Sequence, residues 1–277
     1  MRRIAHISDL HFGRTDPVVV AALAEDLNAD RPDLVAVSGD LTMRARSQEF
    51  RAACAFFDSL RAPVLAVPGN HDITAYWLHE RFLDPLGRWR RFIAAEPEPV
   101  WVDDQIAVVG VNTASRAGTL LDWSQGRVGH TRMQRAAHKL RAVPAHLFRI
   151  VVAHHPFLPP EAASHIPLVG RAEAALAAFA GLGVRMILSG HLHLGYIRAH
   201  GAEAAGGTTG ADSGLLVVQA ATATSTRLRG EPNAYNRIHI ENGRGRVEVR
   251  AWNGSGWTSA WRQPAGVMPR DDIACEP

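Results

Sequence analysis

The chain has 277 residues, of which 47% are hydrophobic, enough for one large core with or without a small appendage. Its formal charge of +3 is mild and its basic residues are dispersed, which does not favour a nucleic-acid ligand. No apolar run approaches the roughly 20 residues that span a bilayer. No apolar targeting segment precedes the first expected strand, so a cytoplasmic location is the default expectation.

The first part of the chain alternates strand-like and helix-like segments. Short apolar runs at 4–8, 34–38 and 64–67 are typical of buried strands. The segments 17–29 and 47–60 have the apolar spacing of helices, and Ser47 is expected to cap the second. This βαβαβ order predicts parallel strands with right-handed crossovers and helices on the sheet faces.

A Trp- and Arg-rich helical stretch follows at 74–96. Two interpretations of it stay open. Because it leaves directly from the end of the third strand, it could overhang that edge as a partial lid. Alternatively, it is a surface helix that packs Trp77, Phe82 and Trp89 on the sheet.

The remaining segments continue the alternation and then change character. Strands are expected at 106–111, 149–153, 184–188 and 215–220, with helices at 131–143 and 171–180. Strands at 237–241 and 246–252 form a hairpin around Asn242-Gly243. The Gly/Thr-rich stretch 206–210 is expected to be a loop, and 254–277 shows no periodicity. The chain therefore divides into one domain, 1–253, and a tail, 254–277.

The cysteines do not indicate a functional site, whereas the positions of the histidines do. Cys54 and Cys275 are too few for a disulfide framework and lack thiolate metal-site spacing, so both are expected to be reduced thiols. The chain has 14 histidines, and six fall at the ends of expected strands. The functional residues are therefore sought at those ends.

Five expected strands are followed by residues whose side chains are of types that can bind metal ions. Carboxyl ends of parallel strands meet at one edge of a sheet, so these side chains should lie together. Asp, Asn and His are the ligands of Zn, Mn, Fe or Co where no thiolate takes part. Seven or more ligands from five loops indicate two ions. The strand-end groups are Asp9 and His11, Asp40, Asn70 and His71, His154 and His155, and His191 and His193.

These blocks resemble the calcineurin-like metallophosphoesterase superfamily. Its signature is Asp-x-His, Gly-Asp, Gly-Asn-His-Asp/Glu, His and Gly-His-x-His, and all five motifs occur here in that order between residue 4 and about residue 195. The resemblance implies a four-layer α/β/β/α sandwich with a dinuclear metal site at the carboxyl ends of the strands. Gly69, in the third motif, is expected to adopt a backbone conformation that a Cβ would forbid.

The resemblance also implies which residues hold each ion, with Asp40 as the bridge. His154 is preferred to His155 because the family pattern is His-x-Pro and Pro156 sets the register; His155 is then substrate-facing or structural. The first ion would be held by Asp9, His11, Asp40 and His193, and the second by Asp40, Asn70, His154 and His191.

A metal-dependent phosphoric ester hydrolase follows from this resemblance. Two divalent or mixed-valence ions would clamp a phosphoryl oxygen and yield a bridging hydroxide that attacks phosphorus. By the same resemblance His71 lies beside the substrate and protonates or stabilises the leaving alkoxide. Asp72 either orients the His71 imidazole or caps the following helix. Arg14 is a candidate phosphate contact.

The substrate is less constrained. Asn112-Thr113 and 126–129 loosely resemble the bacterial branch of cyclic-nucleotide and glycerophosphodiester phosphodiesterases, which favours a small soluble phosphodiester, such as a cyclic nucleotide. The second motif departs from many relatives because Met43-Arg44 follows Leu41-Thr42. A phosphomonoesterase, a nuclease and a nucleotide-lipid pyrophosphatase stay as alternatives. A non-catalytic scaffold of the same fold is disfavoured because every ligand is present. Apolar surface on 74–96 and the late strands is compatible with a homo-oligomer.

Overall fold

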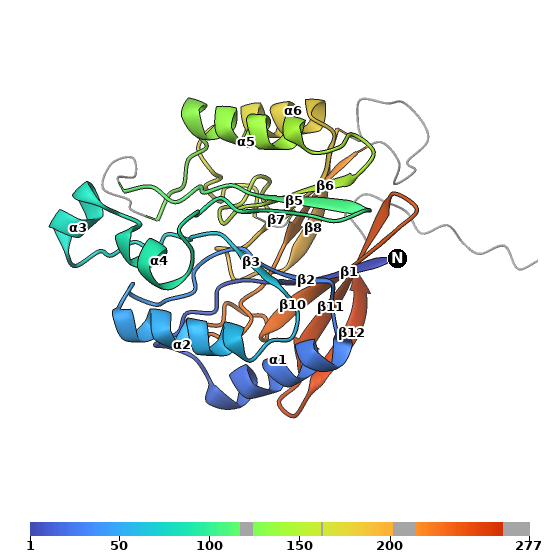
Figure 1. Cartoon of the computed structure of the whole chain (residues 1–277). Helices are drawn as coiled ribbons and strands as arrows, with labels where there is room; N and C mark the ends of the chain where they lie inside the picture. Colours follow the sequence, from blue (N-terminus) through green and yellow to red (C-terminus); the bar gives the residue numbers. More distant parts are fainter. Residues whose placement is uncertain (117–123, 162, 202–213, 263–277) are drawn as a thin grey trace, which may run out of the picture.

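The computed structural model describes residues 1–116, 124–161, 163–201 and 214–262. Two six-stranded sheets lie face to face, and helices cover the outer face of each (Figure 1). The predicted four-layer α/β/β/α sandwich is confirmed. None of the described helices combines the length and the apolar content that a bilayer crossing requires.

The first sheet is built around the N-terminal strand. Strand β1 (Arg2–Ile7) pairs in parallel with β2 (Leu34–Val37), and β2 with β3 (Val64–Ala66), as the βαβαβ order predicts. Strand β10 (Ala234–Glu241) pairs with β1 antiparallel. Helices α1 (Pro17–Asp30) and α2 (Ser47–Asp58) form the crossovers. Across the sheet the order is β12 (Trp257–Arg262), β11 (Arg244–Trp252), β10, β1, β2 and β3.

The second sheet has a parallel centre and two antiparallel edges. Its middle strands run parallel, and helices α5 (His130–Ala142) and α6 (Ala172–Gly181) belong to its outer face. The edge strands β4 (Val100–Val102) and β8 (Tyr196–His200) were not expected from the sequence because they are short or mixed in polarity. The order is β4, β5 (Ile106–Gly110), β6 (Phe148–Val152), β7 (Val184–Ser189), β9 (Leu215–Gln219) and β8.

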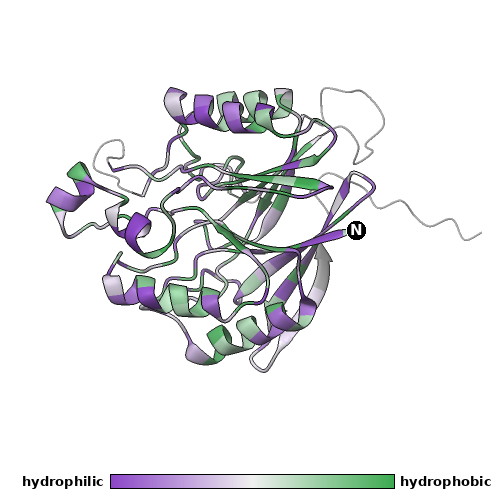
Figure 2. Ribbon diagram, viewed as in Figure 1, coloured by the Kyte–Doolittle hydropathy of each residue, from purple (hydrophilic) through white to green (hydrophobic). Residues whose placement is uncertain are grey.

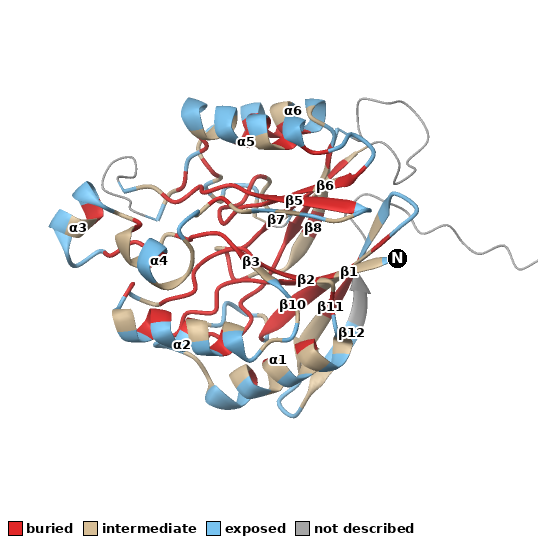
Figure 3. Ribbon diagram, in the orientation of Figure 1, coloured by how far each residue is buried: buried red, intermediate tan, exposed pale blue. Residues whose placement is uncertain are grey.

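Side-chain alternation along the strands builds three apolar layers. In β1, Ile4 faces the second sheet, whereas Ala5 and Ile7 face α1 and α2. Hydrophobic residues are concentrated in the strands, and the helices are hydrophilic on their outer sides (Figure 2). Most of the central strand positions are buried, and exposed residues lie on the outer helices (Figure 3). This double-sided burial holds the strand ends rigidly in place.

The structure differs from the local expectations in several places. Arg46, not Ser47, is the N-cap of α2, and its backbone N–H donates to the Glu49 carboxylate over 3.1 Å. The segment 254–277, to which the sequence assigned no structure, contributes β12 to the first sheet. Cys54 is a free thiol, as expected, and it donates to the Phe92 carbonyl. The expected loop 206–210 and Cys275 lie outside the described residues.

The segment 74–96 forms two short helices, α3 (Leu78–Leu83) and α4 (Gly87–Phe92). Trp89 is fully buried in the core beneath α2, as one interpretation predicted. Trp77 and Phe82 are 40% and 43% exposed, so packing on the sheet was wrong for these two rings. Figure 1 places α3 and α4 at the end of the molecule toward which β1 runs. The role of this segment as a partial lid stays a prediction.

Candidate metal centre

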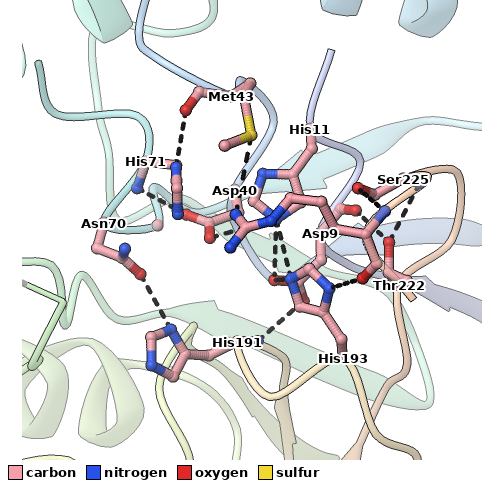
Figure 4. A network of polar contacts seen from close by, with 12 residues as sticks. Asp9, His11, Asp40, Met43, Asn70, His71, His191, His193, Thr222 and Ser225 are labelled. Atoms are coloured by element: carbon pink, nitrogen blue, oxygen red, sulfur yellow. Dashed lines mark hydrogen bonds and ion pairs between the residues drawn. The ribbon is translucent and has the colours of Figure 1, made fainter. Parts of the chain in front are cut away.

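The loops that follow β1, β2, β3, β6 and β7 converge at one edge of the two sheets. The side chains of Asp9, His11, Asp40, Asn70 and His193 lie together there (Figure 4). The first four follow β1, β2 and β3, which are neighbouring parallel strands. The structure also brings His154 and His191 to this cluster. All seven predicted ligands therefore meet at one place, although their binding of metal stays a prediction.

A first group of donor atoms surrounds one point. His11 Nε2 lies 3.0 Å from His193 Nε2, and His193 Nε2 lies 3.4 Å from Asp9 Oδ1. Asp40 Oδ2 lies 3.8 Å from His11 Nε2. Two imidazole nitrogens that face each other so closely, beside two carboxylate oxygens, have the arrangement expected around a cation.

A second group shares one of these oxygens. Asn70 Oδ1 lies 3.0 Å from both His154 Nε2 and His191 Nδ1, and the two nitrogens are 3.2 Å apart. Asp40 Oδ2 lies 3.3 Å from His154 Nε2. This oxygen also belongs to the first group, as the predicted bridging role of Asp40 requires.

The donor set fits a transition-metal ion at each position. Ligand bonds of about 2.1 Å place neighbouring donors roughly 3.0 to 3.4 Å apart in octahedral or tetrahedral geometry, close to most of the separations here. Asp9 Oδ1 is fully buried and has no hydrogen-bond partner among the described residues. A buried carboxylate oxygen without a donor is costly unless a cation binds it.

Hydrogen bonds from the surrounding loops select which atom of each donor faces the ions. Asp9 Oδ2 accepts from the Ser8 hydroxyl and the His191 backbone N–H, and Asp40 Oδ1 accepts from the His71 N–H. Two imidazoles donate through Nδ1 to backbone carbonyls, which leaves Nε2 for the ion: His154 to Ser38 and His193 to Arg227, each over 2.7 Å.

Strained backbone accompanies the proposed ligands. Positive φ values are uncommon outside glycine and need support from the surrounding structure. Buried neighbours supply that support here, since Asp9, Asp40 and His193 are at most 3% exposed. The ligands in the left-handed region are Asp9, His11, Asp40, His191 and His193.

At two positions beside the site, only glycine fits, because a Cβ would overlap a neighbouring side chain. A Cβ on Gly69 would overlap Asp40 Oδ1, and one on Gly190 would overlap Ser8 Oγ. The expectation that the backbone at Gly69 leaves no room for a Cβ is confirmed, although Gly69 does not have a positive φ. Glycine is needed at position 69 because the loop after β3 passes close to the Asp40 carboxylate.

The electrostatics favour an ionised Asp9 and a neutral His191. Burial alone would raise the pKa of Asp9, but the imidazoles of His193 and His11 hold it well below its usual range. Burial and the neighbouring His154 lower the pKa of His191 to about 4. Ionised carboxylate and neutral imidazole are the forms that bind metal. In contrast, and although burial opposes it, Asp40 raises the pKa of His154 to about 9. Asp9 raises the pKa of His193 against the same effect of burial, so a cation would have to displace the protons of these two rings.

His71 lies at the edge of the cluster with its imidazole held by the Met43 carbonyl. His71 Nδ1 donates to that oxygen over 2.7 Å, so Nε2 is the nitrogen left to face the site. The His71 and His11 rings meet edge to face with centroids 4.8 Å apart. A ring nitrogen of His71 also comes within 4.8 Å of donor atoms on His11 and Asp40. Met43, the residue at which the second motif departs from the pattern, therefore positions His71 through its backbone.

Asp72 fills neither role expected from the sequence. Its carboxylate accepts from the backbone N–H groups of Leu41, Thr42 and Gly69 and from the Thr42 hydroxyl. The imidazole of His71 is held by Met43 instead, and the next helix, α3, has Trp77 as its N-cap. Burial and the nearby Asp40 raise the pKa of Asp72 to about 6. Asp72 joins the β2 and β3 loops.

His155 lies beside His154 and His191, with ring centroids 4.8 and 4.7 Å away, but its ring is held by other residues. A substrate contact by His155 or Arg14 stays a prediction. His155 Nε2 donates to the Ser124 carbonyl over 2.8 Å, and Nδ1 accepts from the Thr113 hydroxyl over 2.7 Å, so both ring nitrogens are used. Burial, then His191 and His154, lower its pKa well below the ordinary value. Arg14 is exposed, and in the described ranges its guanidinium has no hydrogen bond or ion pair.

The loop after β9 also supports the site and was not expected from the sequence. The Thr222 hydroxyl donates to the Asp9 carbonyl over 2.7 Å, and the Thr224 hydroxyl donates to the Leu10 carbonyl over 2.8 Å. Arg227, in the same loop, accepts from His193. The run Thr222 to Thr226, rich in hydroxyl side chains, was the available signal in the sequence.

Comparisons with known proteins identify a curated relative. The chain is 37% identical over 94 residues to the glycerophosphodiester phosphodiesterase GpdQ of Enterobacter lignolyticus, and the match covers 30% of this chain and 33% of that protein. The chain thus spans only about a third of the length of that relative.

Solved structures show the same fold at low sequence identity. A dimetal phosphatase from Danio rerio has a TM-score of 0.63 at 12% identity, covering 94% of this chain and 98% of that one. The purple acid phosphatase PPD1 from yellow lupin has a TM-score of 0.68 at 13% identity, covering 99% and 57%.

The family model described as calcineurin-like phosphoesterase matches residues 2–195, which contain every predicted metal ligand. The chain therefore belongs to the calcineurin-like phosphoesterase family.

Proposed function

We propose that this protein is a phosphodiesterase that hydrolyses a small soluble phosphodiester, with a cyclic nucleotide as the first candidate. The similarity to a protein named as a glycerophosphodiester phosphodiesterase supports this substrate class. The two donor groups that share Asp40 support a pair of ions, for which Mn, Fe, Zn and Co are all compatible with nitrogen and oxygen ligands.

The position of His71 is the observation that carries the proposal. An alkyl phosphodiester has a poor leaving group, because the departing alkoxide is strongly basic and needs a proton. His71 Nδ1 is bonded to the Met43 carbonyl, so the proton would be delivered from Nε2, on the side of His11 and Asp40. This arrangement suits an ester whose hydrolysis requires a general acid.

Each group of this chain has a separate task in the proposed reaction. When bound, the two ions would polarise the phosphoryl group and lower the pKa of coordinated water. The seven predicted ligands would hold the ions, with Asp40 as the ligand that they share. The hydrogen bonds from Ser8, Ser38 and Arg227 keep the ligand atoms aimed at them. His71 protonates the leaving oxygen.

A panel of phosphoesters tests the proposal. The protein, loaded in turn with Mn, Fe, Zn or Co, is assayed with 3′,5′-cyclic AMP, glycerophosphoethanolamine, bis-p-nitrophenyl phosphate and p-nitrophenyl phosphate. We expect kcat/KM to be higher for the diesters than for the monoester with at least one metal. Turnover confined to the monoester would contradict the proposal and favour a phosphomonoesterase.

A further inference from the structure

Arg227 is anchored to the candidate metal centre through its backbone. Its carbonyl accepts from His193 Nδ1 over 2.7 Å, and its N–H donates to the Ser225 hydroxyl at 3.1 Å. Antiparallel bridge pairing of Ser225 with Thr15 holds this loop against the one that follows β1. The start of the Arg227 side chain is therefore fixed beside one of the predicted ligands.

The far end of the Arg227 side chain reaches the residue that holds His71. Arg227 Nη1 lies 3.8 Å from Met43 Sδ, and the carbonyl of Met43 accepts from His71 Nδ1. Figure 4 shows the Met43 sulfur pointing toward the cluster of ligands. The His11 ring lies between the two ends, with centroids 5.0 Å from His193 and 4.8 Å from His71. The Arg227 side chain thus extends from the loop that holds His193 to the side chain of Met43, whose carbonyl holds the proposed proton donor.

The guanidinium has no oxygen partner in this position. Arg227 is half-buried, and within the described ranges its side chain has only the Met43 sulfur as a hydrogen-bond acceptor and no ion pair. Other half-buried arginines are satisfied: Arg88 donates to the Ala45 carbonyl and Glu80, and Arg132 donates to two backbone carbonyls. A thioether is a weak acceptor, so the strong N–H donors of Arg227 stay available.

We propose that the Arg227 guanidinium is a catalytic residue that binds a non-bridging oxygen of the phosphoryl group. This rests on the proposed phosphoester hydrolysis at this site. A planar fork of N–H donors matches two oxygens of a phosphate group, as it matches those of a carboxylate. Charge grows on these oxygens in the transition state, so a fixed cation there favours the reaction as well as binding.

Substitution of Arg227 in the metal-loaded enzyme tests the proposal. We expect Arg227→Gln to lower kcat/KM by about 100-fold, the effect of removing one donor to a developing oxyanion. The inhibition constant of inorganic phosphate should rise by about 10-fold, and the metal content should not change. Arg227→Lys should restore part of the activity. Arg229→Gln, two residues on in an exposed position of the same loop, is the matched control and should leave both quantities unchanged.

Chemical rescue separates contact with phosphate from an indirect structural role. Added guanidinium ion should restore part of the turnover of Arg227→Ala and should not affect Arg229→Ala. Unchanged kcat/KM and phosphate inhibition in Arg227→Gln would overturn the proposal. Loss of metal from that variant would also overturn it, since Arg227 would then act only through His193.

The two proposals fail in different ways. If the wild-type protein hydrolyses monoesters alone, the phosphodiesterase function is wrong, while weakened phosphate inhibition of Arg227→Gln still supports the contact. If the wild type hydrolyses no ester, the affinity of the metal-loaded protein for inorganic phosphate, measured by calorimetry in the wild type and in Arg227→Gln, tests the contact. Equal affinity in the wild type and Arg227→Gln would then refute the contact.

Discussion

The imidazole of His71 has a fixed tautomer. Its Nδ1 is committed to the Met43 carbonyl, so the other nitrogen alone can exchange a proton with substrate. The predicted ligands are held through separate hydrogen bonds, to Ser8, Ser38 and the Arg227 carbonyl. Proton donation and metal binding should therefore be separable by substitution.

We expect His71→Ala to retain both metal ions and to lose about 10²- to 10⁴-fold in kcat on an alkyl diester, because the alkoxide must leave without a proton. The loss on bis-p-nitrophenyl phosphate should be smaller, since nitrophenolate is a good leaving group. Metal analysis and steady-state kinetics check both points. His79→Ala, at an exposed position, is the control. Full activity of His71→Ala on the alkyl ester would rule out the acid role.

His6 lies in the interior of the first sheet and should contribute to acid sensitivity. Its Nε2–H donates to the Ser38 hydroxyl over 2.9 Å, and its Nδ1 accepts from Asn236 Nδ2 over 3.2 Å. Burial lowers its pKa from an ordinary value of 6.5 to about 3. Between these two pH values the unfolded chain binds a proton at His6 and the folded protein does not. The contribution of His6 to the free energy of unfolding is therefore fully present above pH 6.5 and is lost as the pH falls.

Chemical denaturation of wild type and His6→Gln measures that contribution. Between pH 7 and pH 5 the unfolding free energy of the wild type should fall by about 2 kcal/mol more than that of the variant. Both proteins are measured in chelator, so that titration of the metal ligands cancels in the difference. Parallel pH profiles for the two proteins would show that His6 does not titrate as its surroundings imply.

The loops after β2 and β3 act as one element because Asp72 joins them. Its buried carboxylate accepts three backbone N–H groups and one hydroxyl from the two loops. These loops carry Asp40, Asn70 and His71. Asp72 therefore sets the position of the bridging ligand relative to the proposed acid without touching the His71 ring.

Asp72→Ala should destabilise the protein by about 3 kcal/mol or more, because several buried N–H donors lose their acceptor. Asp72→Asn, which keeps one acceptor oxygen, should cost less. Below the melting transition, kcat per bound metal should stay within about threefold of the wild type if Asp72 has no part in the chemistry. Unchanged stability with a large loss of kcat would instead support a catalytic role.

The site joins the two halves of the molecule. The first sheet supplies Asp9, Asp40 and Asn70 through the loops after β1, β2 and β3, and the second supplies His154 and His191 through those after β6 and β7. Ions bound there would cross-link the two sheets. Their binding free energy would then add to the stability of the whole sandwich.

Removal of metal should therefore lower the melting temperature. At a free metal concentration about 1,000 times the dissociation constant, the linkage is worth about 4 kcal/mol, or a shift on the order of 10 °C for a chain of this size. Calorimetry with and without chelator measures the shift. Asp40→Ala, which removes the shared ligand, should respond little to chelator. Identical melting of the metal-loaded and chelated wild type would contradict a cross-linking site.

The order of motifs in the sequence determined the family, the fold and the identity of the seven predicted ligands. This was possible because each ligand lies within a few residues of the end of an apolar strand, and parallel strands bring their carboxyl ends to one edge. Such information is local, since the type of residue and its distance from the strand end suffice. Edge strands such as β4 and β12 lack a strong apolar pattern and were not found in this way.

The tertiary structure alone decided what surrounds the ligands. Met43 and Arg227 meet although they are 184 positions apart, and no pattern within either loop indicates the contact. Asp72 and His155 have side-chain types suited to chemistry, yet their partners, Gly69 and Thr113 among them, occupy their polar atoms. A residue type shows what a side chain can do. Its neighbours, brought together by long-range packing, decide which of those roles is left open to it.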